Sequence, residues 1–167
     1  GGVDLRQIGE LCIARYEASS LVIARAPLDP ARVERAFADR LTLTGGRKLD
    51  VPNPPVVRVW GEIGGEPTHL VIFGREAVAL EQGRSSAARV RVAEAFARGK
   101  LRRASPALRG EPLATVAKLL VADAPVRAFA PGPFEGDVAK GLGGLMRAST
   151  AVAASARYAG GDRKSVV

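Results

Sequence analysis

The chain has 167 residues and a mass of 17.4 kDa; 47% of its residues are apolar and 25% are charged, with a net charge of +8 at pH 7. This composition excludes a disordered polyelectrolyte, and no apolar run reaches the roughly 18–20 residues that span a bilayer. One Cys and one His exclude a disulfide framework and most metal or triad chemistry. We therefore expect no transmembrane span, no metal site and no cofactor.

The first third of the chain predicts two strands and a helix. Residues 10–26 are rich in β-branched and apolar types around a serine pair, which is typical of a hairpin. Asp29 as N-cap, Pro30 at the first helical position and apolar residues at four-residue spacing predict a helix, which the glycine pair 45–46 ends. Residues 47–55 hold three prolines and predict an extended loop.

The middle of the chain predicts a meander followed by a helix. Residues 56–63, 68–74 and 76–81 read as three antiparallel strands because short glycine-containing turns separate them. Ser85 or Ser86 can cap the helix that follows and runs to about Arg98.

The last third predicts shorter elements. They are a helix at 111–121, a strand at 125–131, a glycine-weakened helix at 137–149, a strand at 150–159 and the start of a partner strand at 164–167. Adjacent strands joined by short turns favour an α+β fold, with a mainly antiparallel sheet and helices packed on one face.

The domain organisation follows from this order of elements. We assign 1–122 to an α+β unit, and 123–167 to a strand, helix and hairpin that are integral to the same domain or begin a second, related unit. A chain that ends in an unpaired strand favours exchange between copies, so a homodimer is a further expectation.

Basic charge is concentrated between residues 84 and 109, where eight basic residues face Glu94 alone and give a local net charge of +7. This helix and loop could bind an anionic surface, either nucleic-acid phosphate or lipid headgroups. The candidate residues are Arg89, Arg91, Arg98, Lys100, Arg102 and Arg103. The other interpretation is a solvated face of a core-packed helix, favoured because no zinc, helix-turn-helix or RNA-recognition motif accompanies them.

An enzyme would need a different set of residues. Cys12 lies in an apolar, strand-like run that is typical of a small buried hydrophobe, and His69 is the only imidazole that could activate it. No further nucleophile, base and oxyanion donors converge in the sequence. The glycine-rich segments 45–48 and 141–146 lack the spacing of nucleotide-binding loops.

Four segments carry a resemblance to known proteins. They are LDPARV at 28–33, EAVAL at 76–80, SSAARVRVAEAF at 85–96 and ADAPVRAF at 122–129. With the order of elements, they resemble uncharacterised bacterial exported or lipoprotein-like proteins of unknown function, in which similar α+β units occur in tandem behind a signal peptide. The resemblance implies a periplasmic or other extracytoplasmic location and a multi-unit parent protein, and it transfers no catalytic residue.

The leading hypothesis is a non-catalytic binding or scaffolding domain of a bacterial exported or envelope-associated protein, with an unknown protein or an anionic surface as partner. The first alternative is a cytoplasmic nucleic-acid-binding module that uses the basic segment 84–109. The second is an enzyme that uses Cys12 and His69.

Overall fold

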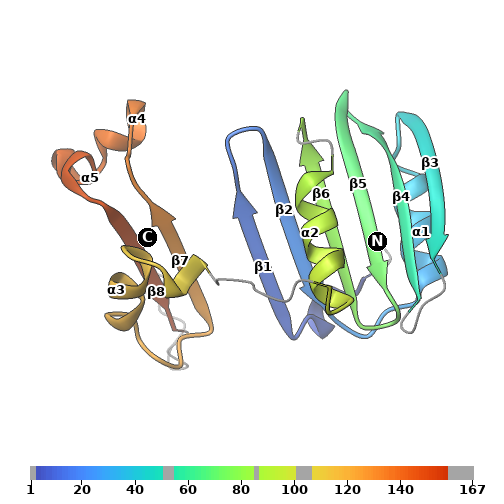
Figure 1. The fold of residues 1–167 in the computed structure, drawn as a ribbon, viewed down its shortest axis with the longest axis horizontal. Coiled ribbons are helices and arrows are strands. Elements are labelled where there is room, and N and C mark those ends of the chain that lie inside the picture. Colours follow the sequence, from blue (N-terminus) through green and yellow to red (C-terminus); the bar gives the residue numbers. More distant parts are fainter. Residues whose placement is uncertain (1–2, 51–54, 85–86, 101–106, 158–167) are drawn as a thin grey trace, which may run out of the picture. The chain divides into compact units, whose positions relative to one another are not determined.

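A computed structural model describes residues 3–50, 55–84, 87–100 and 107–157 of the chain (Figure 1). The chain forms two compact units, 1–102 and 103–167. The sequence places a division after residue 122, whereas the structure groups helix α3 (Leu113–Lys118) with strands β7 (Val126–Pro131) and β8 (Ala151–Ala156).

The first unit is built on one antiparallel sheet with the strand order β1-β2-β6-β5-β4-β3. Its described elements are η1 (Leu5–Gln7), β1 (Glu10–Arg15), β2 (Ser19–Arg25), α1 (Pro30–Ala38), β3 (Leu43–Asp50), β4 (Val56–Ile63), β5 (Glu66–Phe73), β6 (Ala77–Gly83) and α2 (Ala88–Ala97). This confirms an α+β fold with a mainly antiparallel sheet.

The two helices pack on opposite faces of the sheet, with α2 in front and α1 behind in Figure 1. We call the α2 side face A and the α1 side face B. Val56, Val71, Phe73 and Ala79 meet Val90 of α2 on face A, whereas Val57, Val59, Leu70 and Ile72 meet Val33 and Phe37 of α1 on face B.

The expectation that the helices cover one face is therefore wrong in this detail. Residues 70–73 of β5 form an unbroken apolar run, and all four are buried. Because successive side chains of a strand point to opposite sides, such a run needs apolar cover on both faces.

Strand β3 corrects a second expectation, since the glycine pair and residues 47–50 lie in a strand rather than in a helix stop and loop. The register of β3 against β4 shifts between Thr44 and Gly46, which marks a β-bulge. A Cβ on Gly45 or Gly46 would lie 2.6 Å from atoms of the Trp60 ring. The glycines are thus needed where the indole lies against the backbone of β3. Of the expected loop, residues 51–54 lie outside the described part of the chain.

The second unit pairs β7 with β8 antiparallel, so the strands expected at 125–131 and 150–159 are partners. Its other described elements are η2 (Ala107–Arg109), α3, α4 (Gly136–Ala139), η3 (Gly141–Gly144) and α5 (Leu145–Ala148). The single helix expected at 137–149 is split, because Gly143 and Gly144 adopt positive φ values of 67° and 90° that a right-handed helix does not contain. The partner strand expected at 164–167 lies outside the described residues.

Candidate functional site

Helix α2 is held on face A by a carboxylate from the sheet. Ala87 at its N-cap has a left-handed φ of 63° and supplies no side-chain cap. Instead the fully buried Glu81 of β6 accepts hydrogen bonds from the backbone N–H groups of Arg89 and Val90, at 3.0 and 2.9 Å. A carboxylate at a helix N-terminus accepts hydrogen bonds from the free backbone N–H groups and interacts favourably with the positive end of the helix dipole. The serines expected to cap this helix, Ser85 and Ser86, lie outside the described residues.

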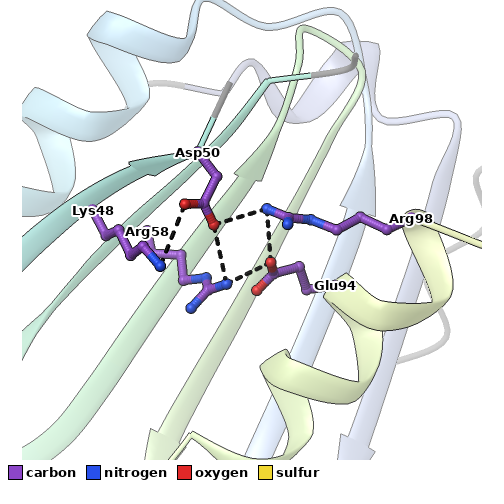
Figure 2. Close-up of polar contacts among 5 residues, drawn as sticks. All are labelled: Lys48, Asp50, Arg58, Glu94 and Arg98. Atoms are coloured by element: carbon purple, nitrogen blue, oxygen red, sulfur yellow. Dashed lines mark hydrogen bonds and ion pairs between the residues drawn. The ribbon is translucent and has the colours of Figure 1, made fainter. Parts of the chain in front are cut away.

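A network of ion pairs fixes the later part of α2 to β3 and β4 (Figure 2). The buried Glu94 carboxylate lies 2.5 Å from Nη2 of Arg58 and 2.8 Å from Nη2 of Arg98. Asp50 lies 3.0 Å from Arg98, 3.4 Å from Arg58 and 3.4 Å from Nζ of Lys48. The network thus joins three cations and two carboxylates, and its net charge is positive.

The cations of this network stabilise the charged form of the Asp50 carboxyl. The Arg98 guanidinium, helped by Lys48, holds the pKa of the Asp50 carboxyl below its usual value, although burial acts in the other direction. The Nε–H groups of Arg58 and Arg98 have no acceptor among the described residues, so the network has more donors than acceptors.

Beside the network, face A contains a recess of about 310 Å³ between α2 and strands β3, β4 and β5. Its polar and aromatic lining consists of Lys48, Arg58, Trp60, His69, Arg91 and Glu94. Val71 and Val90 are among the apolar residues that complete it. Lys48 and Arg58 of this lining are already paired with Asp50 and Glu94. Arg91 is the lining cation that makes no ion pair with a described residue, so it is the group that attracts an anion into the recess.

His69 is one of the titratable groups that line the recess. It lies opposite Trp60 on β4 and Glu81 on β6 in the sheet register. Partial burial lowers the pKa of His69 below its ordinary 6.5; Glu81 opposes this shift, and Arg91 adds to it. The imidazole is therefore neutral at pH 7, where it can donate one hydrogen bond and accept another.

The structure separates the basic residues that the sequence grouped as one anion-binding surface. Arg98 follows Arg91 by seven residues, which is about two helical turns, so both lie on the recess side of α2. Arg89 lies on the other side, 4.1 Å from the ring centroid of Tyr16. Arg98 is 17% exposed at its side chain and is paired with Glu94 and Asp50.

Of the remaining candidates, Lys100 is exposed just after α2, and Arg102 and Arg103 lie outside the described residues. Sequence reasoning missed Lys48, Arg58, Trp60, Glu81 and Glu94 as parts of a site. A usable signal existed for Glu81, because the two-residue period of β6 places it on the same face as the buried Ala79.

The structure does not assemble the proposed Cys12 and His69 pair. Cys12 is exposed on the edge strand β1, and β2 and β6 lie between β1 and the β5 strand of His69. Three strand spacings of about 4.8 Å put the two residues roughly 14 Å apart, far beyond hydrogen-bond reach. The buried position expected for Cys12 is also wrong, because β1 is at the sheet edge.

Comparisons with protein-family models, with curated proteins and with solved structures find no match for this chain. Among the described helices, none combines the length and apolar character that a membrane crossing requires.

Proposed function

We propose that this chain is a non-catalytic binding domain whose ligand occupies the recess on face A. The observation that carries the proposal is the lining of that recess, which combines the indole of Trp60 with the guanidinium of Arg91, beside an ion-pair network of net positive charge. An indole offers a flat apolar surface for a ring, and cations in a concave site attract a negative group. The ligand class that fits is a small molecule with a planar ring and an anionic substituent.

The size and the support of the recess favour a small ligand. A volume of about 310 Å³ is at the lower end of the range of small-molecule pockets. Its walls are strands of the central sheet and a helix anchored at its start by Glu81 and near its end by Asp50 and Arg58. Such walls are preorganised, so little conformational entropy is lost when a ligand binds.

The distribution of cations favours a compact anion over an extended polyanion. Arg91 faces the recess, whereas Arg89 lies over Tyr16 on the far side of α2. Arg98 is paired with two carboxylates, which a nucleic-acid phosphate would have to displace. The bacterial exported or envelope-associated setting is part of the proposal and rests on the resemblance of the sequence.

A pair of probes tests this proposal. Naphthalene-2-sulfonate carries a flat ring and a negative charge, and naphthalene-2-sulfonamide has nearly the same shape without the charge. We expect NMR shifts to concentrate at the Trp60 indole N–H and the His69 ring, with the sulfonate bound about fivefold to tenfold more tightly, since one charge contact is worth about 1 kcal/mol. Shifts spread evenly over the protein, or equal affinity for both probes, would contradict the proposal.

Two arginine variants locate the charge contact. Arg91→Gln should remove most of the preference for the sulfonate, because Arg91 lines the recess. Arg35→Gln is the matched control, since Arg35 is an exposed arginine of α1 on face B, and it should leave the preference unchanged. The nucleic-acid alternative predicts a different result. It would be supported if a single-stranded oligonucleotide bound more tightly than the sulfonate and shifted the NMR signals of Arg89 and Lys100.

A further inference from the structure

Strand β1 has one side that no described strand pairs with, because it is the outermost strand of the first unit's sheet. The N–H of Tyr16 donates to the carbonyl of Ser19 at 2.8 Å, which makes these two residues a hydrogen-bonded pair of the β1–β2 ladder. Such pairs alternate along an antiparallel ladder. The backbone groups of Leu11, Ile13 and Arg15 therefore point outward, away from β2.

The side chains of β1 leave this edge unusually accessible for pairing. Leu11 and Ile13 are 55% and 67% exposed and project from face B, where α1 contacts β4 and β5 instead. The charges of β1 stand only at its two ends, Glu10 and Arg15, and the strand contains no proline. These are the features that natural edge strands avoid.

The opposite edge of the same sheet is built differently. Strand β3 contains the bulge next to Gly46 and carries three charged residues, Arg47, Lys48 and Asp50, all engaged in ion pairs. A bulge and a row of charges both oppose pairing with a further strand. The difference between the two edges points to β1 as the edge that takes a partner.

We infer that β1 pairs antiparallel with β1 of a second copy of this chain, about a two-fold axis that passes beside Cys12. In this register Leu11 lies opposite Ile13 of the second copy, and the same pair forms again on the other side of the axis. Glu10 then lies opposite Ala14, and Arg15 lies opposite Gly9. The four exposed apolar side chains come together on face B, and no charge opposes a like charge.

The sequence of β1 favours a second copy of the chain as its partner, and it favours this register. Moving the axis by one residue to Ile13 would place Leu11 opposite Arg15 and separate the apolar pairs. The Glu10 carboxylate already has a partner, because Arg25 on β2 lies 3.1 Å from it. An interface of one strand pair falls below the roughly 1,000 Å² of stable complexes, so the association should be weak and depend on concentration.

Cys12 provides a reporter for the axis. It is exposed and lies at the centre of the inferred pairing, in a position where the two backbones exchange no hydrogen bonds. Such opposed residues have Cα atoms about 4.5 Å apart, which is within the range of about 4.4–6.8 Å that a disulfide bridges.

The first experiment measures the mass of the full, reduced chain by sedimentation from about 5 to 500 μM. We expect a monomer–dimer equilibrium that Ile13→Lys weakens at least tenfold, because it buries a charge in the paired edge. Leu43→Lys is the control, since Leu43 is 58% exposed on the other edge strand. The far-ultraviolet circular dichroism spectrum verifies that both variants are folded. A chain that stays monomeric throughout, or a dimer that both variants weaken equally, overturns the inference.

The second experiment tests the register with diamide as oxidant. Two Cys12 thiols lose their protons and two electrons to diamide, which is reduced to the hydrazine, and one S–S bond forms between the copies. The control is Cys12→Ser combined with Arg15→Cys, in which the two thiols would lie six positions, or about 20 Å, apart. Cross-linking that is no faster for Cys12 than for this control overturns the proposed axis.

Discussion

The carboxylate of Glu81 gives the sharpest test of how α2 is held on the sheet. Glu81→Ala removes the acceptor of two backbone hydrogen bonds, one of them from the buried N–H of Val90. Loss of an N-cap costs about 0.5–2 kcal/mol, and a buried donor left without a partner costs about 1–3 kcal/mol. We expect the free energy of unfolding to fall by about 2–4 kcal/mol.

The variant Glu81→Gln separates the hydrogen bonds from the charge. Glutamine keeps one acceptor oxygen but loses the negative charge at the helix N-terminus, which is worth about 0.3–2 kcal/mol. We expect the order of stability to be wild type, then Gln, then Ala. Glu76→Ala is the control, because Glu76 is an exposed glutamate in the turn before β6.

Urea unfolding followed by the fluorescence of Trp60, the single tryptophan, measures this order within the first unit. With a urea dependence of about 1–2 kcal/mol per M, Glu81→Ala should lower the midpoint by about 1–4 M. If Glu81→Ala unfolds at the same urea concentration as Glu76→Ala, the carboxylate does not cap α2 and the reasoning fails.

Two further predictions concern the recess. Gly46→Ala should displace the indole of Trp60, because the new Cβ would lie 2.6 Å from its ring, and the maximum of the Trp60 fluorescence emission should therefore shift. Gly9→Ala is the control: its Cβ would lie 3.9 Å from its nearest neighbour, so the emission should stay unchanged. Equal spectra for the two variants would refute the close packing. Burial lowers the pKa of His69, so the unfolded chain binds the proton more readily and stability should decline as pH falls below about 6.5. A proton NMR titration of the His69 ring with a midpoint above 6.5 would contradict this sign.

Local signals in the sequence predict the parts of the fold that depend on neighbouring residues. Asp29 accepts hydrogen bonds from the N–H groups of Ala31 and Arg32, and Pro30 begins α1, as the capping pattern indicates. Strand β4 has the predicted bounds, 56–63, because its alternation and the glycine turn after it are both local.

Features that depend on distant residues escaped sequence reasoning. The pair Gly45 and Gly46 predicts the end of a helix. The contact that explains both glycines is with the ring of Trp60, which lies fourteen residues after Gly46 in the chain. Asp50 and Arg98 are 48 residues apart in the chain and meet only after β3, β4 and α2 have assembled. Charge counting located the basic segment but could not show that Arg98 is neutralised within the fold.

The position of the α2 anchors along the chain has a consequence for the order of assembly. A helix of ten residues is marginal on its own, so α2 depends on the side chains that hold it. Those side chains, Asp50, Arg58 and Glu81, all precede α2 and leave the ribosome before it. In contrast, α1 packs on strands that are synthesised after it. During synthesis α1 can therefore pack only after the later strands of its sheet have been made. Helix α2 can pack on face A as soon as it leaves the ribosome.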